Sequence, residues 1–253
     1  MPERLRAGAF SNQEISICGK MFVADMSGAL FWPSRNAVII ADLIVGVSRS
    51  ENSIRGAGSP HCVEDTMARL AGVIDAYGAT TVIALGGGVA PTCHRDGIAT
   101  TDDHHDSEET SGTGPDVVDM SDTARRSLSI IQEHCSWIWV HDGPTVGGNN
   151  VPAYTADGLT FRDRPTFGLA THEIAGGTRA AATVSRHGHV ITRPCFVGNG
   201  LRLILPTFAQ IAGGQNILSQ TFQPMFGASR LDVWMLGHDG LCPIAPRLLL
   251  ADT

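Results

Sequence analysis

The sequence predicts an α/β protein built around two β-sheets. In its first half, short apolar strands alternate with amphipathic helical segments, whereas the second half is a succession of short, mostly antiparallel strands separated by Gly- and Pro-rich turns. No internal repeat or linker interrupts this order, and 253 residues are enough to bury a sizeable core. A single domain over residues 1–253 is therefore the simplest expectation.

Two strands and a helix open the predicted α/β half. Residues 29–32 and 38–41 are apolar and flank a turn at residues 33–36. A helix then begins at Ser59-Pro60, where Ser can cap and Pro suits the first turn, and it ends at Gly78. Its apolar stripe comprises Val63, Met67, Leu70, Ile74 and Tyr77.

A third strand, a long loop and a second helix come next. Residues 81–85 form the strand, and a helix with an apolar face begins at Ser121 and leads into a strand at residues 137–140. The loop, residues 89–119, carries the acidic and His-rich run Asp102–Glu109. Because consecutive residues rarely converge on one metal, we expect either a solvated acidic loop or an insertion that binds a protein partner.

The second half is predicted to be strand-rich. Its expected strands are residues 159–161, 182–186, 193–197, 201–205 and 233–236. His187-Gly-His189 lies between the second and third of these strands. We interpret it as a hairpin turn in preference to a metal-binding pair.

Composition narrows the possible partners and compartments. The net charge is −7 and Lys20 is the only lysine, which disfavours an extended nucleic-acid surface. No apolar run approaches the roughly 20 residues of a membrane helix, and the N-terminus lacks a secretory signal. Six cysteines without a C-x-x-C pair indicate reduced thiols. We therefore expect a cytoplasmic protein, or one in an organelle matrix of bacterial descent.

Seven segments, in this order, resemble the calcineurin-like metallophosphoesterase superfamily, and more narrowly the bacterial ligase-associated DNA-damage-response endonuclease family. They are Gly28–Pro33, Val38–Leu43, Val82–Gly86, Trp137–Trp139, Leu159–Arg162, Glu173–Gly176 and Arg193–Asn216. The resemblance implies a β-sandwich of two mixed sheets flanked by helices, with two divalent metals (Mn, Fe or Zn) at the strand ends. Two such metals clamp a phosphate and activate water. It also implies a DNA ligase among the partners.

Most of the metal ligands that the resemblance implies are replaced in this chain. Asp42 keeps the first ligand, but Ile44 stands at the neighbouring His position. Gly87 stands where a metal-bridging Asp is expected. His141-Asp142 keeps the proton-donor part of the third motif, without the Gly-Asn that precedes it in the family.

Two later positions carry residues that differ from the family's but can still bind a metal or a phosphate. Asp163 stands where a His is expected after the strand at Leu159, and its carboxylate can still bind a metal. Arg179 replaces a metal-binding His. Its guanidinium can hold a phosphate directly, or it can fill the vacated pocket and pair with Asp42 or Asp163.

These replacements predict a degenerate, non-catalytic metallophosphoesterase-fold protein. It would act as a structural or interaction subunit, with residues 89–119 as a contact surface and no cofactor. The first alternative is an active metal-dependent phosphodiesterase or endonuclease of a DNA-repair type, with a site rebuilt from Asp42, His141, Asp163 and histidines near His104. The second is a phosphate- or nucleotide-binding module centred on Arg179.

Overall fold

The computed structural model describes residues 12–43, 60–87, 122–141, 150–209, 213–227 and 230–252, with the backbone of 47–48 and 118–119. Asp142, Ile44 and nearly all of the predicted 89–119 insertion lie outside the described residues. At the end of that insertion, β7 (Val118–Asp119) pairs with β5 (Val47–Ser48).

The first sheet begins with antiparallel strands and continues with parallel ones. Its order is β1 (Gln13–Ile17), β2 (Lys20–Ala24), β3 (Leu30–Trp32), β4 (Ala37–Leu43), β6 (Thr81–Gly87), β8 (Ser136–Val140) and β9 (Asn150–Val151). The pairs from β1 to β4 are antiparallel, and those from β4 to β9 are parallel. Because neighbouring parallel strands end at the same edge of a sheet, the carboxyl ends of β4, β6 and β8 lie next to one another.

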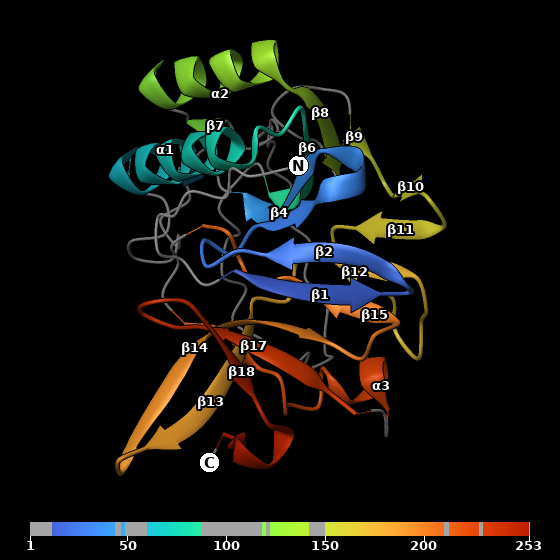
Figure 1. The fold of residues 1–253 in the computed structure, drawn as a ribbon. Helices are drawn as coiled ribbons and strands as arrows, with labels where there is room; N and C mark the ends of the chain where they lie inside the picture. The colour runs from blue at the N-terminus through green and yellow to red at the C-terminus, as the bar shows by residue number, and fades with distance from the viewer. Residues whose placement is uncertain are drawn as a thin grey trace, which may run out of the picture.

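Two helices make the crossovers between these parallel strands and cover one face of the sheet (Figure 1). α1 (Pro60–Tyr77) and α2 (Asp122–His134) match the helices predicted from the apolar stripes. Gly78 has φ +59°, a left-handed conformation that suits glycine and ends α1 as expected. Apolar residues of both helices, such as Leu70 and Leu128, pack against β4 and β6.

The second sheet is also mixed. Its strands are β10 (Tyr154–Ala156), β11 (Leu159–Arg162), β12 (Glu173–Ala175), β13 (Ala180–Arg186), β14 (His189–Gly198), β15 (Arg202–Ile204), β16 (Gln215–Asn216), β17 (Asp232–Leu236) and β18 (Leu241–Ile244). β14 pairs antiparallel with β13, β15 and β17, as the sequence predicts. In contrast, β11, β12 and β15 run parallel to one another, as do β13 and β16.

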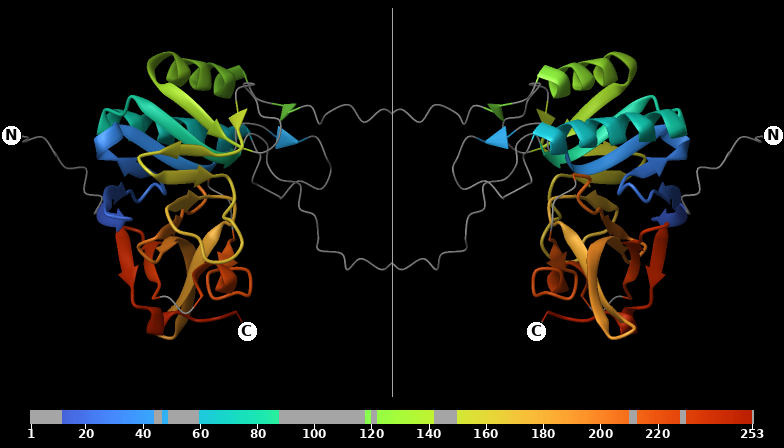
Figure 2. Two further views of the ribbon diagram at one scale, coloured as in Figure 1. Left: turned by 90° about the vertical axis from the view of Figure 1, so that its right-hand side faces the viewer. Right: turned by 90° about the vertical axis from the view of Figure 1, so that its left-hand side faces the viewer.

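The two sheets pack face to face and enclose the central core. That core combines Trp32 and Ile39 of the first sheet with Phe161, Phe196 and Leu203 of the second, all almost fully buried. A third apolar cluster lies on the outer face of the second sheet, where α3 (Gln223–Phe226) packs. Figures 1 and 2 show the resulting layers, with α1 and α2 over the first sheet and the second sheet beneath it. The predicted α/β class with two mixed sheets is therefore confirmed.

The sequence analysis did not predict the first hairpin, β1–β2. β1 and β2 alternate buried and accessible residues, with Ile15, Ile17, Phe22 and Ala24 facing the core. The alternation was present in the sequence, and Cys18-Gly19 between the strands adopts the positive φ values of a tight hairpin turn.

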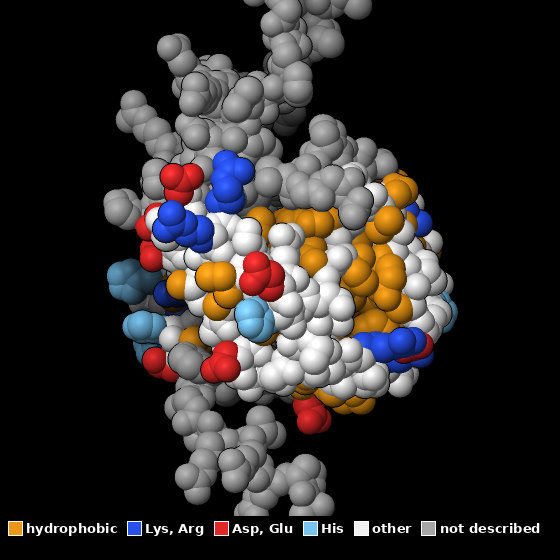
Figure 3. Space-filling view, turned by 90° about the horizontal axis from the view of Figure 1, so that it is seen from above, with side chains coloured by type: hydrophobic (Ala, Val, Ile, Leu, Met, Phe, Trp, Pro, Cys, Tyr) orange, Lys and Arg blue, Asp and Glu red, His pale blue; other side chains and the backbone are white. Residues whose placement is uncertain are grey.

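The helical face of the molecule carries exposed apolar side chains. Figure 3 shows apolar side chains gathered on one part of the upper surface. Ile130 of α2 is 57% exposed. Among the described helices, none is both long and apolar enough to cross a membrane.

Candidate functional site

Strand ends of both sheets bring the predicted site residues together. Asp42 lies near the end of β4, His141 directly follows β8, and Asp163 directly follows β11. Arg179 follows β12 and precedes β13. Four of the five predicted site residues therefore lie at one edge of the sandwich, and the fifth, Asp142, lies outside the described residues.

Asp42 is held by groups from the second sheet. The Thr207 hydroxyl donates to its Oδ2 at 2.9 Å, and the Gly177 N–H donates to its Oδ1 at 3.2 Å. Thr207 is placed there because it forms a parallel bridge with Ala41, and the Phe208 N–H donates to the Ala41 carbonyl. The backbone of Asp42 has φ +53°, a conformation that aspartate tolerates better than most residues.

Burial of this carboxylate sets its protonation. It raises the pKa of Asp42 from its usual value near 4 to about 6, against the opposing effects of the two hydrogen bonds and the Arg179 charge. The nearby Asp163 charge adds to the rise. Part of the residue remains accessible, but the carboxylate itself is packed against the second sheet. A free energy cost therefore remains when Asp42 is ionised.

Asp163 is engaged with His141. Asp163 Oδ2 lies 3.0 Å from His141 Nδ1, and the side chains are 13% and 27% exposed. The sequence paired His141 with its neighbour Asp142, but the described partner of His141 comes from the second sheet. A carboxylate at Nδ1 fixes the orientation of the imidazole.

Arg179 lies near Asp42, one of the two carboxylates with which the sequence analysis expects it to pair if it fills the vacated pocket. Its charge acts on Asp42, and it adopts φ +50° after the turn Gly176-Gly177-Thr178. The Thr178 hydroxyl oxygen is buried and makes no hydrogen bond with the described residues.

Two consecutive glycines, Gly86 and Gly87, follow one another at the end of β6, and only one of them lies between the carboxylates of Asp42 and Asp163. A Cβ on Gly86 would lie 3.4 Å from Asp163 Cβ and 3.7 Å from Asp42 Oδ1, both ordinary contacts. A Cβ on Gly87 would overlap the Leu43 carbonyl oxygen and lie 2.6 Å from the Leu43 nitrogen. The residue that faces the site is therefore Gly86, not Gly87 as the sequence comparison placed it. Gly87 is required where the β4 and β6 backbones pair.

The donors that the structure describes at this edge do not fit a pair of divalent metals. Among the described residues, no group of three His, Cys, Asp or Glu side chains is arranged to hold one metal ion. The carboxylates of the predicted site that the structure describes are Asp42 and Asp163, and each already forms hydrogen bonds with protein groups. A two-metal centre needs a shared carboxylate and several further ligands.

The comparisons with known proteins report a shared fold. The structure matches the crystal structure of the Pseudomonas putida nuclease MPE with a TM-score of 0.60 and 18% sequence identity, over 92% of this chain and all of that chain. A scan against protein-family models gives no match, and a search of curated protein sequences gives none either. At this identity the likeness establishes a nuclease- or phosphoesterase-like fold. The narrower ligase-associated family stays a prediction.

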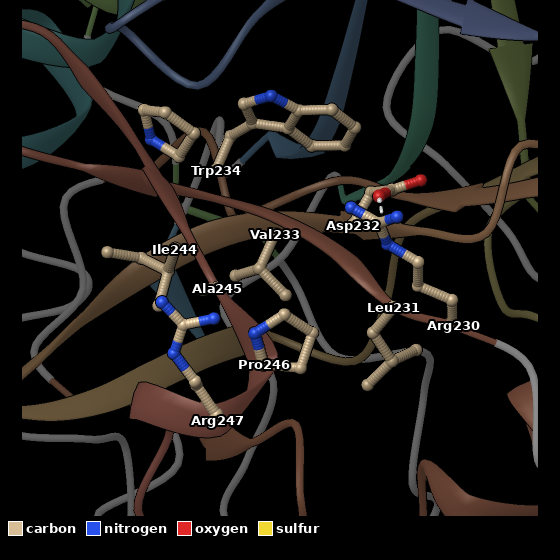
Figure 4. A pocket seen from close by; sticks show the side chains of 10 residues that line it. Arg230, Leu231, Asp232, Val233, Trp234, Ile244, Ala245, Pro246 and Arg247 are labelled. Carbon is tan, nitrogen blue, oxygen red and sulfur yellow. Dashed lines mark ion pairs between the residues drawn. The ribbon is translucent and has the colours of Figure 1, made fainter.

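A separate pocket lies on the second sheet, away from the predicted residues. Its volume is about 690 Å³, and none of Asp42, His141, Asp163 or Arg179 lines it. Arg230 and Arg247 stand on opposite sides of its apolar floor, which includes Val233 and Pro246 (Figure 4). Arg230 Nε lies 3.8 Å from Asp232 Oδ1.

Two site residues escaped the sequence reading. Thr207 and Gly177 hold Asp42, yet neither belongs to a ligand motif. Thr207 follows Pro206 at the end of a strand that the sequence did predict, so the sequence marked its position near an edge. Its contact with Asp42 depends on how the two sheets pack.

Proposed function

We propose that this chain is a phosphoesterase-fold protein that does not catalyse two-metal hydrolysis and that acts as a structural or interaction subunit. The observation that carries the proposal is Gly86. It occupies the point between Asp42 and Asp163, where a side chain could supply a shared ligand, and it offers none. The two carboxylates already bond Thr207, Gly177 and His141, and the described residues of this edge offer no further set of donors for a bridging water and its metals.

Hydrolysis of a simple phosphodiester tests the proposal. The full chain is incubated with Mn²⁺ and bis(4-nitrophenyl) phosphate, next to an Asp42→Asn/Asp163→Asn double variant prepared in parallel. We expect equal, background rates for both proteins. Mn²⁺-dependent turnover by the natural chain that is absent from the double variant would establish the alternative, an active phosphodiesterase with a rebuilt site.

A second function, anion binding at Arg179, is favoured by a specific observation. The buried hydroxyl of Thr178 has no hydrogen-bond partner among the described residues and is adjacent in sequence to a guanidinium. A phosphate oxygen accepts from both kinds of group. In thermal unfolding with inorganic pyrophosphate, this function predicts stabilisation without turnover, reduced in Thr178→Val and lost in Arg179→Gln. An unchanged melting temperature of the natural chain contradicts it.

A further inference from the structure

The chain divides into an acidic part and a basic part. Residues 1–173 contain 22 acidic and 12 basic side chains, whereas residues 174–253 contain three acidic and six basic ones. No Asp or Glu occurs between Ile174 and Leu231. The second sheet beyond β12 therefore presents positive charge in a protein whose overall charge is negative.

The β13–β14 hairpin concentrates this charge on an extension of the fold (Figures 1 and 2). Its two-residue turn, His187-Gly188, has φ values of +52° and +79°, which match the twist of a tight hairpin. In the register, Arg186 pairs with His189 and Ala182 pairs with Arg193. Because paired residues share a face, Arg186, His189 and Arg193 all point to one side.

These cations are available to a partner. Arg186, His189 and Arg193 are exposed, and neither arginine forms an ion pair with any described residue. On the opposite face, Val190 is 68% exposed beside Thr192. The hairpin tip thus offers positive charge on one face and an apolar side chain on the other.

The outer edge of β14 has backbone groups that face away from β13. Beyond a two-residue turn, Arg186 and His189 exchange hydrogen bonds, so the N–H and C=O groups of Val190 and Thr192 point outward. β17 pairs with β14 only from Cys195 onward. Within the described part of the chain, residues 189–194 of β14 therefore have no strand on this side.

We propose that this open edge of β14, residues 189–194, binds an extended acidic peptide segment of a partner protein by strand addition. Backbone hydrogen bonds to Val190 and Thr192 would supply the pairing. Alternate side chains of the added strand would fall on the face of Arg186 and Arg193, where carboxylates form charge-assisted hydrogen bonds. Such binding gives the proposed interaction role a partner chemistry and rests on that role, but it needs no property of the Asp42 edge.

The same features disfavour two other occupants. A second copy of β14 would place arginines opposite arginines, and charges at edge strands protect against such self-pairing. A nucleic acid would use the guanidinium groups but leave the outward backbone groups and Val190 without a role. An acidic strand would contact the guanidinium groups, the outward backbone groups and Val190.

Peptide binding to the full chain tests the proposal. The probe is a fluorescein-labelled, end-blocked peptide that alternates Glu with Thr and Val, and its match is the same peptide with Lys in place of Glu. We expect saturable binding of the Glu peptide and none of the Lys peptide, measured by fluorescence anisotropy at low salt. Bound peptide should slow the amide hydrogen exchange of Val190 and Thr192, which a merely electrostatic contact would not do.

Variants separate charge from strand pairing. Arg186→Glu/Arg193→Glu should weaken binding of the Glu peptide by about tenfold or more and allow the Lys peptide to bind. Val190→Pro, which removes an outward N–H, should abolish binding, whereas Val190→Ser keeps that N–H and should retain most of it. Circular dichroism confirms that each variant is folded.

Three results would overturn the proposal. The first is no binding of the Glu peptide, and the second is binding without protection of Val190 and Thr192. The third is a preference for a 20-nucleotide single-stranded DNA, or for a second copy of the chain, that depends on the two arginines. None of these results bears on Mn²⁺-dependent hydrolysis, so failure here is distinguishable from failure of the non-catalytic role.

Discussion

Two buried carboxylates of the sandwich, Glu173 and Asp42, have opposite environments. Glu173 begins β12 and pairs with the fully buried Arg202, the first residue of the neighbouring strand β15. Asp42 lies at the end of β4 and has a raised pKa because burial outweighs its hydrogen bonds. One carboxylate is matched by a buried cation, and the other is only partly compensated.

The Glu173 network is closed within the protein. Arg202 Nε lies 2.7 Å from Glu173 Oε2, and the other guanidinium nitrogens donate to carbonyl groups of Thr166, Gly168 and Met225. Glu173 Oε1 accepts from the Thr166 N–H and hydroxyl. Arg162 Nε also lies 3.5 Å from Glu173 Oε1. The network therefore ties the loop after β11 and the end of α3 to the sheet.

Glu173 and Asp42 both lie in segments that resemble the ligase-associated endonuclease family, but only Glu173 belongs to a closed structural network. Glu173 lies in the segment Glu173–Gly176 and Arg202 in Arg193–Asn216, so two of these segments meet in a structural ion pair. Asp42 lies in a third such segment, but at an edge where its partners are hydrogen-bond donors and one nearby cation. The residues that hold the fold together are therefore different from those at the candidate site.

The largest expected effect comes from opening the closed network. Arg202→Met removes the fully buried cation and leaves Glu173 only the longer contact with the half-buried Arg162. Losing one partner of a buried ion pair typically costs about 3–5 kcal/mol. Urea unfolding at pH 7 measures the loss. A double variant, Arg202→Met/Glu173→Leu, should recover much of it because no charge remains buried. If the double variant is less stable than Arg202→Met, the ion pair is not what makes the single substitution costly.

The next effect distinguishes the two glycines after β6. Gly87→Ala should cost on the order of 3 kcal/mol, because the new Cβ overlaps the Leu43 backbone. Gly86→Ala should cost about 1–2 kcal/mol, because its φ of +70° is unfavourable but space is available. Thermal and urea unfolding of both variants provide the comparison. Equal losses would contradict the assignment of Gly86 as the residue that faces the site.

Removing the charge of Asp42 should stabilise the protein. Asp42→Asn keeps the shape and tolerates φ +53°, and we expect a gain of about 2 kcal/mol at pH 7.5 and almost none at pH 4. The sign follows from a folded-state pKa of about 6 that lies above the unfolded value. The folded state holds its proton more tightly, so the stability of the natural chain falls as pH rises from about 4 to about 6 and then levels.

Stability measured from pH 4 to pH 8 checks this sign. The part of the pH dependence due to Asp42 is the difference between the natural chain and Asp42→Asn. A difference that is constant over this range would show that the carboxylate is not the cause.

The smallest effect concerns the hydrogen bond from Thr207. Thr207→Val removes a donor to the Asp42 carboxylate, so the pKa of Asp42 should rise further. We expect a loss of about 1 kcal/mol at pH 7.5 and less at pH 4, where Asp42 is protonated and the bond is weaker. NMR titration of the Asp42 carboxyl carbon measures the shift directly. A pKa that falls in Thr207→Val would contradict the described contact.

Much of the fold was predictable because it depends on local patterns. Helices α1 and α2 followed from apolar stripes and their end signals, and β3, β4, β6 and β8 of the first sheet from short apolar runs. The parallel pairing of β11, β12 and β15 was not predictable, because neither the strand lengths nor their alternation specify direction. The β1–β2 hairpin was readable from its alternation but was not read.

The sequence predicted which residues form the candidate site, but it did not predict the contacts between them. Asp42, His141, Asp163 and Arg179 were identified from the resemblance to the family's ligand motifs, and the structure places them at one edge. The pairing of His141 with Asp163 and the Thr207 hydrogen bond to Asp42 depend on how the two sheets pack. The assignment of Gly86 to the site depends on how the β4 and β6 backbones pair beside Gly87. The sequence carries no direct record of such contacts between strands.

The metal content of the purified full chain tests the central claim most directly. The protein is equilibrated with Mn²⁺, freed of unbound metal and measured by inductively coupled plasma mass spectrometry, beside the Asp42→Asn/Asp163→Asn variant. We predict well under one ion per chain, with no difference between the two proteins. Two ions per chain in the natural protein, lost in the double variant, would contradict the account and indicate a working two-metal centre.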